Sequence, residues 1–116
     1  MKLYKLYYEY RHEVDEPAVF ACICEADQVQ KIEKHYSELF GLLIDPCRDD
    51  ASGDRIPVEE LTSDPVLQGW ESFDGVILED LVTSERFYYE ETGSRTWVTK
   101  YTYVRDYKLN KITEEQ

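Results

Sequence analysis

The sequence lacks any long hydrophobic run. No apolar stretch approaches the roughly eighteen residues of a membrane-spanning helix, and residues 1 to 9 hold no uninterrupted apolar segment of about seven residues. A transmembrane helix and a secretory signal peptide are therefore not expected. We expect a cytoplasmic protein with no membrane partner.

Cysteine is scarce and odd in number. The chain has three cysteines, Cys22, Cys24 and Cys47, and no export signal, which favours reduced thiols over a disulfide framework. Together with His35 they are residue types that bind zinc. Structural zinc sites usually have two closely spaced ligand pairs, however, and this chain has only the pair Cys22-x-Cys24. We therefore expect no metal and no cofactor, and a metal-binding domain stays an alternative.

Motifs of catalysis are also missing. There is no glycine-rich phosphate loop, no GxSxG motif and no dinucleotide fingerprint, and the only histidines are His12, in a charged turn, and His35, on an expected helix. Asp49 and Glu60 have the spacing of the first and last ligands of an EF-hand loop, but Asp54 replaces the glycine that such a loop needs. No catalytic residue is expected, and a small enzyme is a less favoured alternative.

Basic residues are rare in the middle of the chain, where the acidic ones gather. Residues 44 to 92 hold fourteen carboxylates and three arginines, which accounts for −11 of the formal net charge of −12. Such a charge distribution repels nucleic acid and anionic membranes and attracts cationic surfaces. We therefore expect a partner with a basic protein surface, and no direct contact with nucleic acid.

The chain does contain enough apolar and aromatic residues for one folded unit. Its 116 residues match a common domain size, and 42% hydrophobic with 14% aromatic residues is too much for a disordered chain. No repeat, low-complexity tract or linker divides it. We expect a single α+β domain over residues 1–116, with a frayed tail over residues 108–116.

Periodicity predicts strands at both ends of the chain. Residues 2 to 11 alternate between two faces, and the apolar run 18 to 24 indicates a central strand antiparallel to them. Asp74-Gly75 predicts a turn between two short strands. Thr92-Gly93-Ser94 predicts the turn of a hairpin that ends near Tyr107.

One long helix is predicted between these strands. Apolar residues recur at spacings of three and four over residues 29 to 43, and Asp27 with Gln30 resembles a capping box. Either Gly41 ends the helix or it continues for another turn. Residues 45 to 65 are rich in turn formers, and only short helices fit there. The sequence therefore predicts an α+β fold: a mainly antiparallel sheet of about four to six strands, one long helix packed on one face, and an acidic irregular insertion.

Aromatic residues on the strands allow a further interpretation. Rings on a sheet can stack on single-stranded nucleic acid when basic residues surround them, and basic residues do cluster near the C-terminus. These are Arg95, Lys100, Arg105, Lys108 and Lys111. The negative charge of the whole chain penalises a polyanion, so packing of the sheet is the favoured role of the rings.

Carboxylates that project from short elements can imitate the phosphates that basic grooves bind. This favours a non-enzymatic, acidic protein-binding module that inhibits a nucleic-acid-handling complex by mimicking nucleic acid. Small acidic proteins of phage counter-defence, such as anti-CRISPR proteins, are similar in size and charge. The alternatives are an immunity protein that neutralises a basic toxin or nuclease, and an acidic face that only keeps the chain soluble. The residues expected to bind the partner are Asp45, Asp49, Asp50, Asp54, Glu59, Glu60, Asp64, Trp70, Glu71, Tyr88 and Tyr89.

Overall fold

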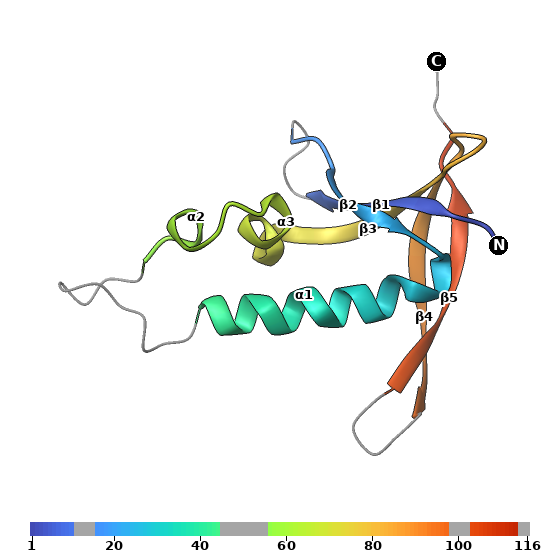
Figure 1. The fold of residues 1–116 in the computed structure, drawn as a ribbon. Coiled ribbons are helices and arrows are strands. Elements are labelled where there is room, and N and C mark those ends of the chain that lie inside the picture. Colours follow the sequence, from blue (N-terminus) through green and yellow to red (C-terminus); the bar gives the residue numbers. More distant parts are fainter. Residues whose placement is uncertain (11–15, 45–55, 98–102, 114–116) are drawn as a thin grey trace.

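A single antiparallel sheet with helices beside it makes up the fold (Figure 1). The computed structural model describes residues 1–10, 16–44, 56–97 and 103–113. Its strands are β1 (Tyr4–Tyr10), β2 (Val19–Cys24), β3 (Phe73–Asp80), β4 (Arg86–Trp97) and β5 (Tyr103–Lys111). Its helices are α1 (Val29–Leu43), α2 (Val58–Leu61) and α3 (Pro65–Gln68), and its 3-10 turns are η1 (Ala26–Gln28) and η2 (Trp70–Ser72).

The described strands form a five-stranded sheet in the order β2-β1-β3-β4-β5, and every neighbouring pair is antiparallel. α1 packs alongside it, so the predicted α+β class is confirmed. In the described parts of the chain, no helix is long and apolar enough to cross a membrane.

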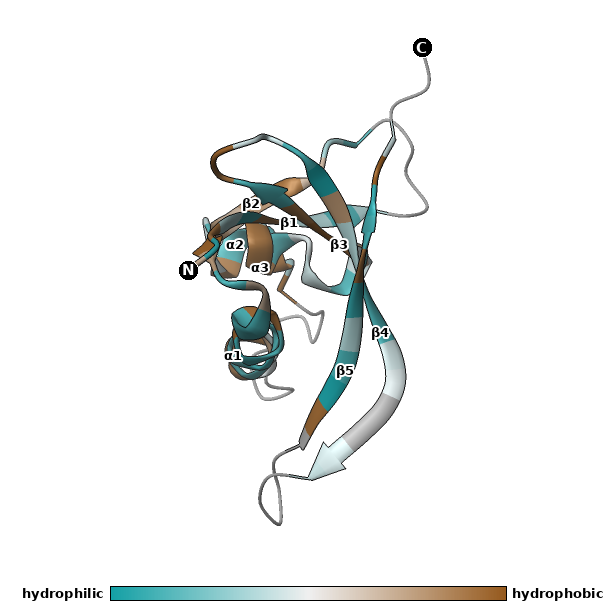
Figure 2. Ribbon diagram, turned by 90° about the vertical axis from the view of Figure 1, so that its right-hand side faces the viewer, coloured by the Kyte–Doolittle hydropathy of each residue, from teal (hydrophilic) through white to brown (hydrophobic). Residues whose placement is uncertain are grey.

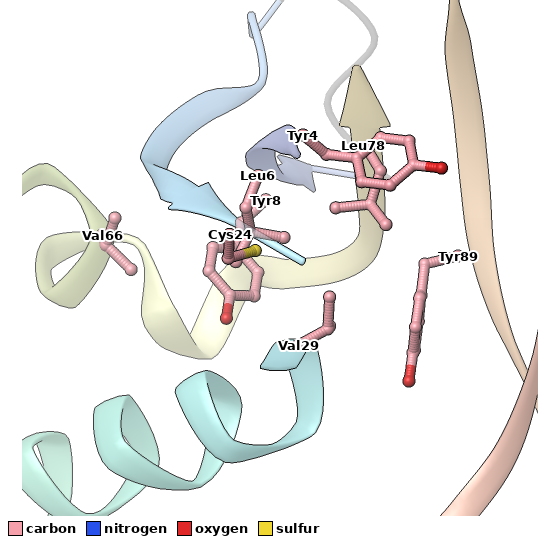
Figure 3. Close-up of a cluster of buried hydrophobic side chains, with 8 residues drawn as sticks. All are labelled: Tyr4, Leu6, Tyr8, Cys24, Val29, Val66, Leu78 and Tyr89. Carbon is pink, nitrogen blue, oxygen red and sulfur yellow. The ribbon is translucent and has the colours of Figure 1, made fainter. Parts of the chain in front are cut away.

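β1 alternates between the two faces of the sheet, as its sequence predicts. Tyr4, Leu6 and Tyr8 are buried on the face that carries α1, so Tyr7 points to the opposite face. Leu6 and its partner Leu78 on β3 have no exposed surface. They lie at the centre of a cluster that also draws on α1, α3 and β4 (Figure 3).

β2 lies at the edge of the sheet, so the prediction of a central strand was wrong. Its apolar run on both faces has another cause. Cys24 is buried on the face that carries α1, whereas Phe20 packs its ring edge-on against Tyr7 on the opposite face, with 5.7 Å between ring centroids. Ile23 stays 52% exposed. Packing on both faces therefore explains the apolar run, although β2 has a neighbouring strand, β1, on one side only.

α1 begins where the prediction placed it, but other residues cap its start. Its first residue is Val29, and η1 precedes it; the backbone N–H of Glu25 donates to the side-chain oxygen of Gln28 at 2.9 Å. The capping box is thus Glu25 with Gln28, and not Asp27 with Gln30. The helix passes through Gly41 to residue 43, where the N–H of Ile44 bonds to the carbonyl of Phe40.

α1 packs against the sheet and against the short helical elements that follow it in the sequence. Val29, Ile32 and Tyr36 pack against the core of the sheet, whereas the helix also contacts α3 and η2. α3 is capped by Asp64, whose carboxylate accepts the N–H of Val66 at 2.9 Å. Figure 1 shows α2 farther from the sheet than α3. The segment from α2 to η2 is therefore held to the body through α3.

Two predicted turns are interior positions of strands. Asp74 and Gly75 lie inside β3, because β1 pairs along that strand and Gly75 is opposite Glu9. Residues 92 to 94 lie inside β4, where the register shifts between Glu91 and Arg95 and Gly93 has a φ of 87°. A glycine in the left-handed region suits a bulge as well as a turn, which explains the error.

The hairpin of β4 and β5 is longer than predicted. β3 pairs only with residues 86 to 88 of β4, so the rest of β4 and its partner β5 extend beyond the sheet as a two-stranded ribbon. Figure 2 shows this ribbon curving past α1. β5 continues to Lys111, so the expected fraying is wrong for residues 108 to 111.

Candidate functional site

Several acidic residues of the sheet form ion pairs within the chain. The ion pairs join neighbouring strands or a strand to a nearby turn, and most of their carboxylates belong to the acidic middle of the sequence. They are Lys5–Glu79 (3.8 Å), Arg86–Glu79 (3.9 Å), Lys111–Glu85 (3.7 Å), Lys108–Glu90 (3.6 Å), Arg105–Glu91 (2.5 Å) and Lys2–Asp80 (3.3 Å). Much of the negative charge of β3 and β4 is therefore compensated internally.

Asp80 has a structural role at the end of β3. Its side chain is 3% exposed, and its carboxylate accepts the backbone N–H groups of Val82 (2.8 Å) and Thr83 (3.0 Å). The hydrogen bond from Thr83, then that from Val82 and the charge of Lys2, lower the pKa of Asp80. This acid closes a turn and is not part of a binding surface.

The predicted acidic residues divide into three groups. Asp45, Asp49, Asp50 and Asp54 lie outside the described residues. Asp64 caps α3 and is structural. Glu59, Glu60 and Glu71 are exposed, and no basic side chain among the described residues forms an ion pair with them.

The predicted aromatic residues do not share one surface. Tyr88 and Tyr89 are consecutive in β4 and point to opposite faces. Tyr88 is 40% exposed, whereas Tyr89 is 8% exposed and stacks on Tyr107 with centroids 4.7 Å apart. Trp70 is half-buried on the same side as Tyr89. Only Tyr89 and Trp70 therefore remain together as candidate contacts.

Gln30 connects α1 to the edge of β5. Its side-chain nitrogen donates to the carbonyl of Arg105 (2.6 Å) and to the hydroxyl of Tyr89 (2.9 Å), and its side-chain oxygen accepts the N–H of Arg105 (2.8 Å). The amide thus pairs with β5 as a neighbouring strand would. It fixes the ribbon relative to the helix.

A cleft of about 540 Å³ lies where α1, η2, β3 and β4 meet. Its aromatic lining residues are Tyr8, Trp70, Phe73 and Tyr89. Its acidic lining residues are Glu33, Asp74, Glu90 and Glu91. Among the residues that the structure describes, no lysine, arginine or histidine lines the cleft, so the described lining is aromatic and negative.

The aromatic wall of the cleft is a packed cluster of rings. Tyr8 lies edge-on to Trp70, with centroids 5.2 Å apart, and stacks on Phe73 at 5.5 Å. Tyr36 of α1 contacts both rings, with centroids 5.7 Å from Trp70 and 6.2 Å from Tyr8. Such contacts hold the rings in fixed orientations. The wall is therefore formed before any ligand arrives.

The hydroxyl group of Tyr8 has no hydrogen-bond partner. Tyr8 is 3% exposed, and its hydroxyl is the one buried side-chain polar atom among the described residues that is left unsatisfied. Figure 3 shows it pointing from the sheet toward α1. Desolvation, with a contribution from Glu33, raises the pKa of Tyr8, so the hydroxyl is protonated at neutral pH.

Glu33 is a site residue that the sequence did not reveal. It is on the polar side of α1 and keeps an exposed side chain, yet it lines the cleft. The protein atoms packed around its carboxyl group raise its pKa, the charge of Glu91 adds to the rise, and Arg105 opposes it. Its negative charge is therefore only partly compensated.

Cys22 and Cys24 pack in the core or against it. Cys24 is buried and Cys22 is half-buried on the same strand, and burial raises the pKa of both thiols, that of Cys24 to about 12. Cys47 lies outside the described residues, and His35 is exposed on α1 beside Tyr36. In the described parts of the chain, no three His, Cys, Asp or Glu side chains gather into a group that could hold a metal ion.

Similarity to known proteins does not add to this description. Comparisons with protein-family models, with curated proteins and with solved structures found no match. The candidate site therefore rests on its own residues: an aromatic and acidic cleft beside a segment of exposed carboxylates.

Proposed function

We propose that the protein is a non-enzymatic binding module that engages a basic surface of a partner protein. The observation that carries this proposal is the contrast between two groups of acids. Glu79, Glu90 and Glu91 of the sheet form ion pairs within the chain, whereas Glu59, Glu60 and Glu71 are exposed and form none with the described residues. These three belong to the segment from α2 to η2, which we call the acidic segment (residues 58 to 72).

The sequence around the acidic segment holds no counter-charge. Residues 56 to 85 contain eight carboxylates and no lysine, arginine or histidine, and of these carboxylates Glu79, Asp80 and Glu85 form an ion pair with a described basic residue elsewhere in the chain. Like charges that stay uncompensated repel one another and disfavour the compact state, so a basic partner gains by neutralising them. The same field accelerates the encounter with a basic surface.

The partner that we propose is a protein whose basic surface handles nucleic acid. Grooves that bind phosphates are lined with lysine and arginine, and carboxylates held on a folded scaffold can occupy them in place of phosphates. The chain acts in this proposal as an inhibitor or adaptor. Its folded scaffold would position the charges before binding, which lowers the ordering cost of association.

The test uses an oligo-lysine peptide as a defined basic probe. Its affinity is measured by fluorescence anisotropy at about 50 and about 200 mM salt, because an electrostatic complex weakens as salt screens the charges. The variant Glu59→Lys/Glu60→Lys should bind about tenfold more weakly, since each reversal replaces an attraction by a repulsion of up to about 1 kcal/mol.

A matched control changes the net charge by the same amount at paired acids. In Glu38→Lys/Glu85→Lys both replaced carboxylates have a lysine partner in the chain, at 3.9 Å and 3.7 Å. This variant should lose clearly less affinity than the first. Equal losses in the two variants would mean that only net charge matters, and absence of binding at low salt would overturn the proposed function.

A further inference from the structure

The cleft beside the acidic segment has the features of a cation site. Trp70, at the start of η2, lines the cleft, and the next residue is the exposed Glu71. Trp70, Phe73, Tyr8 and Tyr89 all contribute to the lining. A cation near an aromatic ring is attracted by the electron density of the ring, most strongly by that of tryptophan. An anion is repelled by the same electron density.

The charge of the lining has the sign that such a site needs. Its four carboxylates are Glu33, Asp74, Glu90 and Glu91, and no basic residue among the described ones joins them in the lining. Two of them bind cations of β5 at the margin: Glu91 pairs with Arg105 at 2.5 Å, and Glu90 pairs with Lys108 at 3.6 Å. Glu33 comes from α1 and Asp74 from β3, so the carboxylates reach the cleft from three elements. The cleft is therefore electronegative as well as aromatic.

The Tyr8 hydroxyl supplies an independent indication of a ligand. It belongs to a 97% buried residue of the cleft wall and has no partner, although a buried hydroxyl without a hydrogen bond is costly by about 1–3 kcal/mol. The oxygen itself has almost no exposed surface, so a donor bound in the cleft satisfies it only when the side chains over it move aside. Glu33 lies close enough to influence its ionisation.

We propose that this cleft receives an arginine side chain of the basic partner. The proposal rests on the proposed function and specifies it further. A guanidinium group is planar, so it can lie against Trp70 or Phe73, and its several N–H donors can reach the Tyr8 hydroxyl and a carboxylate together. The ammonium group of lysine is compact and strongly hydrated, and it stacks less well.

The test compares an oligo-arginine peptide with an oligo-lysine peptide of equal length and charge. The wild-type chain should bind the arginine peptide about fivefold to tenfold more tightly, as expected for one stacked and hydrogen-bonded cation. If neither peptide binds at low salt, the proposed function fails as well. If both bind with equal affinity, the acidic module stands and the arginine site is wrong.

Single substitutions test whether the cleft residues cause the preference for the arginine peptide. Tyr8→Phe removes only the hydroxyl and keeps the ring, so the chain should stay folded and the ratio of the two affinities should fall at least twofold. Glu33→Gln should lower the ratio as well, whereas Glu38→Gln, on the same helix but not in the lining, should leave it unchanged. An unchanged ratio in both Tyr8→Phe and Glu33→Gln would overturn the proposal.

A free guanidinium compound tests whether the cleft binds small guanidinium compounds instead of an arginine side chain of a partner. Methylguanidinium and methylammonium are titrated into the chain, and the indole N–H signals of Trp70 and Trp97 are followed by NMR. Methylguanidinium should shift the Trp70 signal, while Trp97, which does not line the cleft, serves as the reference. A shift without selectivity for the arginine peptide would mean that the cleft takes small guanidinium compounds, and the proposal of a partner's arginine would be wrong.

Discussion

Replacing Gln30 by alanine tests how α1 is joined to the edge of the sheet. The Gln30 amide forms two hydrogen bonds with the backbone of Arg105 and one with the Tyr89 hydroxyl. The variant removes all three bonds and leaves these groups in place. Tyr89 is 8% exposed, so water replaces its lost partner only in part.

The size of the effect follows from the environment of the three bonds. Each contributes about 0.5–1.5 kcal/mol net, and the two at the edge of β5 are at the low end because water can reach them. Alanine recovers a few tenths of a kcal/mol through its higher helix propensity. We expect a loss of about 2 kcal/mol in the free energy of unfolding, or about 8 °C in Tm at roughly 4 °C per kcal/mol.

The assay is urea unfolding followed by tryptophan fluorescence, combined with hydrogen exchange of the Arg105 amide. The matched control is Lys31→Ala, the exposed neighbour of Gln30, which should change the free energy of unfolding by less than about 0.5 kcal/mol. Exchange at Arg105 should accelerate in Gln30→Ala and not in the control. Equal stability of the two variants, with unchanged exchange, would refute the role assigned to Gln30.

Three further predictions concern stability. Tyr8→Phe should leave the free energy of unfolding unchanged or raise it by up to about 2 kcal/mol, because the lost hydroxyl has no partner. The measurement is urea denaturation, and a clear decrease in the free energy of unfolding would mean that the hydroxyl forms a hydrogen bond that the structure lacks. Gly69→Ala should lower stability by about 1–3 kcal/mol, because the new methyl group would lie 2.7 Å from a ring carbon of Phe73; thermal unfolding measures this, and a Tm equal to wild type would contradict it. Asp80 has a lowered pKa in the fold, so its contribution is present above its unfolded pKa of about 3.9 and disappears as pH falls through the folded value. The stability difference between wild type and Asp80→Asn should therefore shrink on acidification, and a difference that stays constant from neutral pH to about pH 2 would contradict this account.

Local periodicity was a good guide where one element packs on one face. The alternation around Tyr4, Leu6 and Tyr8 predicted β1, and the spacing of three and four residues predicted α1, because burial against a core imposes these periods. Turn signals were a poorer guide. Gly75 and Gly93 are compatible with a turn, but pairing with β1 and β5 keeps both inside strands.

The candidate site was predictable only in its charge. The sequence identified the exposed acids Glu59, Glu60 and Glu71, but it could not separate them from the acids that form cross-strand ion pairs. That separation depends on register: Glu79 is opposite Lys5 and Arg86 only because β3 pairs with both of their strands. The prediction that Asp45, Asp49, Asp50 and Asp54 bind the partner stays a prediction, because these residues lie outside the described parts of the chain.

The amino-acid sequence by itself determined the acidity of the middle of the chain, the α+β class and the absence of long apolar segments, because these follow from composition and from contacts between near neighbours. Only the tertiary structure decided which carboxylates are compensated and where the cleft lies. Tyr8, Glu33 and Trp70 come from β1, α1 and η2, and they meet because β1 pairs with β3 and α1 packs across both. Contacts between residues so far apart in the chain leave no periodic signal in the sequence, since their spacing is set by the path of the whole fold.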